Sequence, residues 1–124
     1  MKVVFVCVEN SNRSQMAEAF GRMAGLEAYS AGSKPSGVVN PKAIEAMREL
    51  GYDLSKHQSK GLNDLPPGEF DLAITMGCGD ECPMLKAKRR EDWQIPDPKL
   101  MPPDEFRKVR DEIAAKVKAL ASGK

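Results

Sequence analysis

Cys7 and Arg13 are the residues of this sequence whose types and spacing favour catalysis. Cys7 follows an apolar run at 3–6 that is typical of a short buried strand, and the sequence at 15–20 is typical of the start of a helix. The segment 7–14 is therefore predicted to be a loop that joins a strand end to a helix N-terminus. Backbone N–H groups of such a loop can point inward, and the helix dipole favours negative charge there. Arg13 adds a bidentate fork for a tetrahedral anion, so Cys7 would be a thiolate nucleophile facing a bound oxyanion.

The same segment permits a simpler interpretation. A cysteine at the end of an apolar strand is often just a small buried residue, and its spacing to an arginine occurs by chance in many chains. The position between a strand and a helix favours the catalytic interpretation. Under it, the oxyanion would be held by the loop residues Val8, Glu9, Asn10, Ser11, Asn12, Arg13 and Ser14.

Length and composition indicate one domain, spanning 1–124. A chain of 124 residues can bury about two-thirds of its unfolded surface in a single core. Lysine and arginine together number 19 and aspartate and glutamate 18, so charge gives no case for nucleic acid or an anionic membrane. The N-terminal apolar run is short for a signal peptide and no stretch is long enough to span a membrane, so we expect a cytoplasmic protein, and a monomer. In a cytoplasmic protein, three cysteines are more typical of reactive, metal-binding or incidental residues than of structural disulfides.

Strands alternate with helices along the chain. The segments 27–31 and 70–76 predict a second and a third strand, and 93–95 predicts a short fourth strand after a charged loop or irregular helix at 77–90. This alternation implies right-handed βαβ units and a parallel sheet. The pattern matches an α/β fold, a flavodoxin-like, doubly wound three-layer sandwich whose four parallel strands have the order 2-1-3-4. In that order the first and third strands are neighbours, and the loop 7–14 lies in the crevice at their carboxyl ends.

Three helices are predicted from apolar residues at helical spacing. The second begins at Asn40 and Pro41, because asparagine is a good N-cap and proline suits the first helical position. The last follows the two prolines at 102–103. The predicted buried stripes are Met16, Phe20 and Met23 in the first helix, Ile44, Met47 and Leu50 in the second, and Phe106, Val109, Ile113, Val117 and Leu120 in the last.

The segment 7–14 resembles the phosphate-binding loop shared by low-molecular-weight protein tyrosine phosphatases and thioredoxin-coupled arsenate reductases. The sequence Ser-Gln-Met-Ala-Glu at 14–18 is similar to the reductase branch, because the phosphatase branch usually has proline where Gln15 stands. The similarity extends from the N-terminus to about the last helix. Two positions depart from the family pattern: small residues are common where Glu9 stands, and a small residue or a cysteine where Asn12 stands. The side chain of Glu9 must therefore point away from the anion.

Cys78 and Cys82 follow the predicted third strand. Because adjacent parallel strands lie about 4.8 Å apart and a disulfide needs Cα atoms about 4.4–6.8 Å apart, the fold could bring Cys78 near Cys7. The resemblance implies a relay in which Cys7 attacks arsenate, Cys78 attacks Cys7 with release of arsenite, and Cys82 attacks Cys78. The gap between Cys78 and Cys82 is shorter than in most relatives, so thioredoxin, glutaredoxin and a small thiol all remain open as the reductant. The alternatives are a metal-binding pair or two unrelated cysteines. A full zinc site needs about four ligands, and His57 is the only histidine.

Asp97 is the candidate general acid. The sequence Ile-Pro-Asp-Pro at 95–98 resembles the loop that carries this acid in both branches, where a carboxyl gives a proton to the departing oxygen. Taken alone, an aspartate in a proline-rich turn is commonly just a solvated turn residue. The resemblance also implies that Asn10 and Ser14 hold the loop's shape and bond the thiolate.

No tightly bound cofactor is expected, although some reductases hold a potassium ion beside this loop. Asn10, Glu18 and Ser33 are the candidate ligands of such an ion in this sequence. Glu18 is equally typical of a surface helix residue. His57 lies in the polar stretch 56–60 and is predicted to be a surface side chain.

Three functions are compatible with these residues. The leading hypothesis is an arsenate reductase for arsenic detoxification that uses the three-cysteine relay. The alternative is a low-molecular-weight phosphatase, in which Cys7 forms a phosphocysteine that water resolves, and the second alternative is a non-catalytic oxyanion or redox sensor. Lys99 and Leu100 favour the reductase, because phosphatases of the family usually have aromatic residues there, and a phosphatase needs neither Cys78 nor Cys82.

Overall fold

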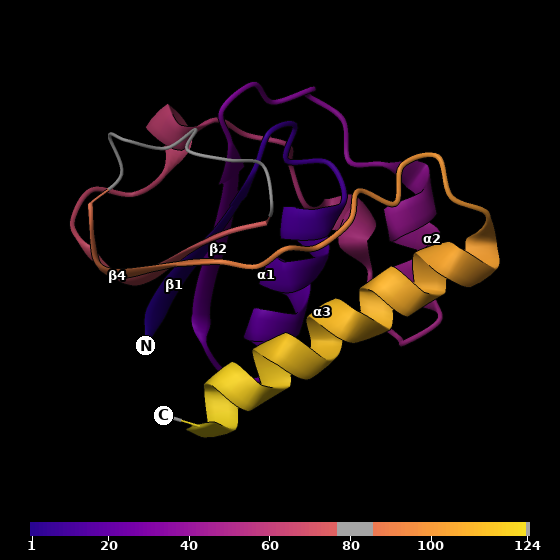
Figure 1. Cartoon of the computed structure of the whole chain (residues 1–124). Coiled ribbons are helices and arrows are strands. Elements are labelled where there is room, and N and C mark those ends of the chain that lie inside the picture. Colours follow the sequence, from indigo (N-terminus) through magenta and orange to yellow (C-terminus); the bar gives the residue numbers. More distant parts are fainter. Residues whose placement is uncertain (77–85, 124) are drawn as a thin grey trace.

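The computed structural model describes residues 1–76 and 86–123, so Cys78 and Cys82 lie outside the described residues. Its strands form one parallel sheet in the order β2-β1-β3-β4, as predicted. The strands are β1 (Lys2–Cys7), β2 (Glu27–Gly32), β3 (Phe70–Thr75) and β4 (Ala87–Asp92). The helices are α1 (Arg13–Met23), α2 (Pro41–Arg48) and α3 (Pro103–Gly123), with short 3-10 helices η1 (Leu54–Lys56) and η2 (Leu62–Asp64) (Figure 1).

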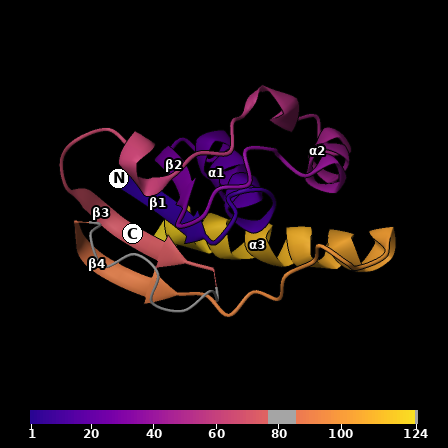
Figure 2. The same ribbon diagram turned by 90° about the horizontal axis from the view of Figure 1, so that it is seen from above.

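The side chains of β1 alternate between the two faces of the sheet, with the period of two that a strand imposes. Val3 and Phe5 belong to a core cluster that includes the buried stripes of α1 and α3. Val4 and Val6 belong to a smaller cluster on the other face, against which Leu62 of η2 packs. Figure 2 shows α1 and α3 on one side of the sheet and η2 on the other. α1 and α3 therefore cover much more of one face of the sheet than η2 covers of the other. α2 packs against α1, α3 and η1.

β4 corrects the prediction of a fourth strand at 93–95. It lies earlier, at Ala87–Asp92, and most of its residues are exposed because, among the described strands, it pairs with β3 alone at the sheet edge. A solvated edge strand needs no apolar alternation, and charged side chains protect such an edge from pairing with other chains. Trp93 and Ile95, which suggested the strand, are buried after β4 ends, and the Trp93 N–H donates to the Thr75 carbonyl at 2.8 Å.

The predicted buried stripes are confirmed at most positions, but Ile44 and Leu120 are only partly buried and Met23 and Leu50 are exposed. α1 begins two residues before the predicted start at 15. Asn40 caps α2, where its side chain accepts the N–H of Lys42 at 2.8 Å. Met23 and Leu50 are 52% and 42% exposed, because Met23 is the last residue of α1 and Leu50 lies beyond the end of α2. None of the described helices combines the length and the apolar character that a membrane span requires. The buried residues of the α3 stripe are Phe106, Val109, Ile113 and Val117.

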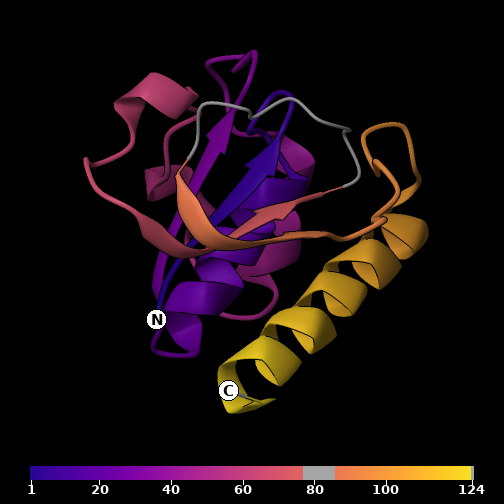
Figure 3. The ribbon, with the colours of Figure 1, turned by 60° about the vertical axis from the view of Figure 1, so that its left-hand side comes forward.

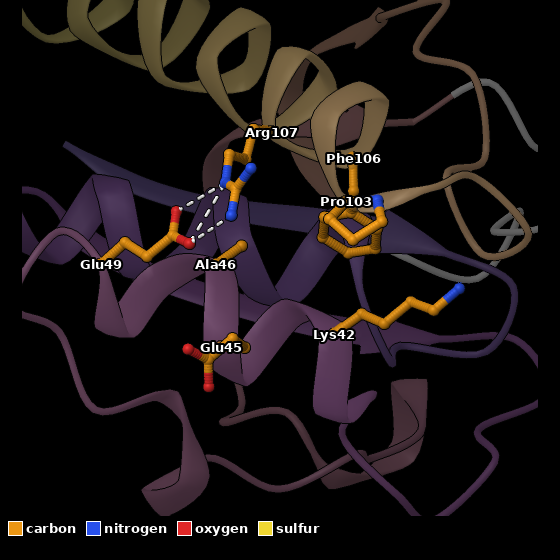
Figure 4. Close-up of a pocket in the computed structure, with 7 residues that line it drawn as sticks. All are labelled: Lys42, Glu45, Ala46, Glu49, Pro103, Phe106 and Arg107. Carbon is orange, nitrogen blue, oxygen red and sulfur yellow. Dashed lines mark hydrogen bonds and ion pairs between the residues drawn. The ribbon is translucent and has the colours of Figure 1, made fainter.

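Charged residues join α2 to α3 beside a pocket between the two helices (Figure 4). Glu49 accepts from Arg107 Nη2 at 2.9 Å and from Arg110 Nη1 at 2.8 Å. These bonds, chiefly those from Arg107, hold the pKa of Glu49 below its ordinary value. Lys42 also lines this pocket, and its ammonium reaches the loop that precedes α3. The junction therefore fixes α2 relative to α3 and to that loop.

Candidate active site

The loop 7–14 leaves the carboxyl end of β1 between two neighbouring strands. Cys7 pairs with Gly32 of β2, and Val6 pairs with Thr75 of β3. The arrowheads of β1 and β2 point to the same end of the molecule (Figure 3). The loop therefore begins where the strand order reverses, which is the position where open parallel sheets bind ligands.

Neighbouring segments hold the backbone of this loop in place. Asn10 has a left-handed φ of 51°, which is uncommon for a residue other than glycine. The loop's carbonyl groups are held from outside, with Val8 bonded by the N–H of Lys34 at 2.8 Å, Glu9 by Ser36 at 3.0 Å and Ser11 by Asn40 at 2.8 Å. Because these carbonyl groups are bonded from outside, they do not turn inward to repel an anion.

Cys7 lies at the end of a chain of buried polar side chains. Its Sγ is 2.9 Å from Ser14 Oγ, which accepts from Asn10 Nδ2 at 2.8 Å. Since the Asn10 amide donates to Ser14, the hydroxyl proton of Ser14 can be donated to the sulfur, which stabilises a thiolate. Ser14 thus contacts the sulfur directly, whereas Asn10 reaches it only through Ser14.

Arg13 is oriented by the backbone of two other segments. Its Nη1 donates to the carbonyls of Met76 at 2.6 Å and Ile95 at 2.9 Å. Its Nε is buried and has no hydrogen-bond partner among the described residues, and Nη2 lies 3.9 Å from Asp97. The edge formed by Nε and Nη2 is therefore the one that can make a bidentate contact with a tetrahedral anion.

Asp97 lies at the boundary between the anion loop and solvent. Its side chain is 52% exposed. Oδ1 accepts from the Lys99 N–H at 3.0 Å and from Asn12 Nδ2 at 3.4 Å. Asn12 also caps α1, because its side chain accepts the N–H of Arg13. From this position a carboxyl can exchange protons with water and pass one to a leaving oxygen.

Glu9 points away from the anion, as its place in the loop requires. Its side chain is half-exposed, and Oε2 lies 3.5 Å from Lys99 Nζ. Its carbonyl oxygen accepts from the Ser59 hydroxyl at 3.0 Å. The negative charge is therefore paired outside the loop, and this departure from the family pattern leaves the loop able to hold an anion.

A buried polar network behind the loop includes residues that the sequence did not assign to the site. Gln15 Nε2 donates to Asn10 Oδ1 at 2.9 Å and to the carbonyl of Gln58 at 2.9 Å. Gln15 Oε1 lies 2.9 Å from His57 Nδ1, so Nδ1 is the donor, since an amide oxygen only accepts. In the neutral ring, His57 Nε2 then accepts from the Tyr52 hydroxyl at 2.6 Å. The network runs from Tyr52 to Asn10 and supports the loop from the protein side.

The prediction of a surface position for His57 is wrong, because its side chain is only 8% exposed. Burial lowers the pKa of His57 below its ordinary value of 6.5 and favours the neutral ring. The surface interpretation of Glu18 is wrong as well, since its side chain is 2% exposed. The polar sequence 56–60 gave no sign of burial. Gln15 was the available signal, because a long polar side chain between the predicted buried neighbours Ser14 and Met16 needs partners inside the protein.

The three potassium candidates are largely occupied by other partners. Asn10 Oδ1 accepts the N–H of Lys60 at 2.8 Å. The Glu18 carboxylate pairs with Arg22 at 2.6 Å, and Lys60 Nζ lies 3.7 Å from it. Ser33 Oγ is buried and unpartnered within 1–76 and 86–123, but one hydroxyl cannot replace the other donors. Because an ammonium already supplies positive charge beside Glu18, the residues present do not fit a potassium ion.

The fold and the site together define a class of protein. A cysteine ends the central strand of a parallel sheet, an anion loop follows it, and a buried arginine and a half-exposed carboxyl face the same place. Such a protein is built for attack by a thiolate on the central atom of a tetrahedral oxyanion.

The chain belongs to the low molecular weight phosphotyrosine protein phosphatase family, which matches residues 2–123. It is 43% identical over 123 residues to arsenate reductase 2 of Staphylococcus saprophyticus, covering 94% of this chain and 92% of that protein. It is also similar to a solved arsenate reductase in the phosphate binding state, with a TM-score of 0.89 and 36% identity. For a second solved structure, an arsenate reductase in the oxidized state, the TM-score is 0.86 and the identity is 35%. Both alignments cover 99% of this chain and 98% of the other chain. The predicted family and fold class are confirmed.

Proposed function

We propose that this protein is an arsenate reductase that transfers electrons through a three-cysteine relay. The observation that carries the proposal is that Cys7, the Nε and Nη2 edge of Arg13 and the Asp97 carboxylate converge on one loop. It occurs in a chain 43% identical to a protein named arsenate reductase 2.

The first step joins Cys7 to arsenic. Arsenate binds to the loop N–H groups and to Nε and Nη2 of Arg13. The Cys7 thiolate attacks arsenic, an S–As bond forms and the As–O bond opposite it breaks. The departing oxygen, which already carries one proton, takes a second from Asp97 and leaves as water. Arsenic remains As(V) in this covalent adduct.

The second step reduces arsenic. The Cys78 thiolate attacks Cys7 Sγ, the S–As bond breaks, and its electron pair stays on arsenic, which leaves as arsenite, As(III). The two sulfurs have been oxidised to a Cys7–Cys78 disulfide. Cys82 then attacks Cys78 and releases the Cys7 thiolate, and a cytoplasmic dithiol protein of the thioredoxin type reduces the Cys78–Cys82 disulfide by exchange.

Contacts at the end of β3 support the relay. The N–H of Met76 donates to the carbonyl of Val6 at 3.0 Å, and the carbonyl of Met76 accepts from Arg13. The chain therefore passes beside Cys7 at Met76, two residues before Cys78 in the sequence. Two residues span at most about 7 Å, so the proposed attack requires no long-range rearrangement of β3.

A coupled assay tests the proposal. The purified chain is incubated with arsenate, thioredoxin, thioredoxin reductase and NADPH, and arsenite is measured directly, with glutaredoxin and a monothiol as parallel reductants. We expect multiple turnover with thioredoxin. Cys78→Ser and Cys82→Ser should stop multiple turnover yet retain hydrolysis of p-nitrophenyl phosphate, whereas Cys7→Ser should lose both.

The same assay separates the other two functions. A phosphatase would hydrolyse p-nitrophenyl phosphate without producing arsenite, and a sensor would give at most one arsenite per chain. Repeated arsenate reduction by Cys78→Ser would reject the relay, because no resolving thiol would then be needed at that position.

A further inference from the structure

An ion pair joins the anion loop to the loop that carries Asp97. Glu9 Oε2 and Lys99 Nζ lie 3.5 Å apart, and both side chains are about half exposed. Lys99 follows Asp97 by two residues, and its N–H donates to Asp97 Oδ1 at 3.0 Å. Glu9 and Lys99, called here the cross-loop pair, therefore connect the loop 7–14 to the segment that carries Asp97.

The backbone is held at both ends of the cross-loop pair. The Glu9 carbonyl accepts from the Ser36 N–H and the Ser59 hydroxyl, each at 3.0 Å. The Lys99 carbonyl accepts from Lys42 Nζ at 3.0 Å, and Figure 4 shows Lys42 extending from α2 at the edge of the pocket. Because neither loop has to be ordered for the two side chains to meet, the entropic cost that weakens most exposed pairs is reduced.

The geometry of in-line attack determines which part of a substrate lies beside the cross-loop pair. In-line attack places the departing oxygen opposite Cys7 Sγ, and the proton donor must reach that oxygen. With Asp97 as the donor, an organic group on that oxygen extends past Asp97 toward Lys99, whose N–H bonds the same carboxylate. Arsenate and inorganic phosphate carry at most a hydrogen at that position, whereas a phosphoester carries a carbon chain or ring.

We propose that the cross-loop pair is a specificity determinant that makes the site favour small inorganic oxyanions over bulky esters. It narrows the space beyond the departing oxygen and so disfavours esters with bulky groups. The inference rests on the proposed function for the identity of the substrate, but it concerns binding and is tested without turnover.

The test compares two ligands that the protein cannot hydrolyse. Isothermal titration calorimetry of the reduced full chain gives Kd for inorganic phosphate and for phenylphosphonate, in the wild type, Glu9→Gln, Lys99→Met and the double variant. A change in nearby charge alters the Kd of both anions. This shared effect cancels in the ratio of Kd for phenylphosphonate to Kd for phosphate. We expect this ratio to fall roughly two- to fivefold in each single variant, the range that loss of an exposed ion pair produces. In the double variant the ratio should be no lower than in the single variants, because the pair acts as a unit.

Lys88→Met provides a matched control. Lys88 Nζ forms an exposed pair with Asp71 at 3.7 Å, at the amino ends of β3 and β4 and so away from the anion loop. This variant should keep the wild-type ratio. The inference is overturned if Lys99→Met gives the same ratio as Lys88→Met, or if the effects of the two single variants multiply in the double variant. If the wild type fails to reduce arsenate while Lys99→Met still lowers the ratio, the reductase proposal falls and the specificity role stands.

Discussion

The hydroxyl of Ser14 lies 2.9 Å from the sulfur of Cys7. A hydrogen bond to a charged group contributes about 1.5–3 kcal/mol, and each 1.36 kcal/mol changes a rate about tenfold. Ser14→Ala should therefore lower kcat/KM for hydrolysis of p-nitrophenyl phosphate roughly 10- to 100-fold. The control is Ser122→Ala, at the exposed end of α3. A loss of less than about threefold in Ser14→Ala would mean that the thiolate is held by other groups.

His57 should make stability depend on pH near neutrality. Burial lowers its pKa in the folded protein, whereas the unfolded chain keeps a value near 6.5. Below about pH 6.5 the unfolded state binds the proton more readily, so the contribution to stability is fully present above that pH and is lost as pH falls toward the folded-state pKa.

His57→Gln removes this titration and leaves an amide that can still bond Gln15. Urea unfolding at about pH 7, 6 and 5 should show a steeper fall in the free energy of unfolding for the wild type than for the variant. Equal slopes would show that protonation of His57 is not linked to folding.

At the scale of elements, the end of β2 approaches the anion loop so closely that only glycine fits. A Cβ on Gly32 would lie 2.5 Å from the carbonyl oxygen of Val8 and 2.9 Å from the N atom of Asn10. Backbone cannot rotate out of the way as a side chain can. Gly32→Ala should therefore displace the loop, weaken phosphate binding at least tenfold, and lower stability by about 1–3 kcal/mol, as overpacking does.

Gly21→Ala is the matched control for this variant. A Cβ on Gly21 of α1 would lie 2.8 Å from the Cβ of Ala28 in β2, so it crowds a helix–strand contact rather than the anion loop. Chemical unfolding should show a loss of stability in both variants, and calorimetry should show weaker phosphate binding in Gly32→Ala alone. Equal binding losses in the two variants would contradict a direct contact between β2 and the loop.

The elements also differ in how well they could be predicted from the sequence. β1, β3 and the α3 stripe were predictable because burial demands apolar residues at a fixed spacing, and α2 because Asn40 and Pro41 mark a helix start. β4 was not, because an edge strand is held by backbone bonds to its neighbour and leaves its side chains in water.

At the scale of the whole molecule, Arg13 connects three segments that are distant in sequence. It begins α1 and bonds the carbonyl groups of Met76 and Ile95. An anion bound to Arg13 and to the loop therefore stabilises the folded chain as a whole, since the unfolded chain has no such site.

Phosphate should accordingly raise the free energy of unfolding by about 2.7 kcal/mol at 100 times its Kd. Thermal unfolding in phosphate, compared with chloride at equal ionic strength, measures this effect. Arg13→Lys should lose most of the shift at the same phosphate concentration, because an ammonium cannot form the bidentate contact. An unchanged shift in Arg13→Lys would place the bound anion elsewhere.

The sequence by itself determined the first three strands, the parallel strand order and the position of Cys7 and Arg13 between β1 and α1, because these follow from local spacing and from rules of chain connection. Only the tertiary structure decided what surrounds that loop. The burial of His57 and Glu18, the ion pair between Glu9 and Lys99, and the use of Lys60 beside Glu18 all join residues from separate segments. Such contacts depend on how elements pack in space, and a polar residue shows no periodicity in the sequence that would reveal which distant partner it meets.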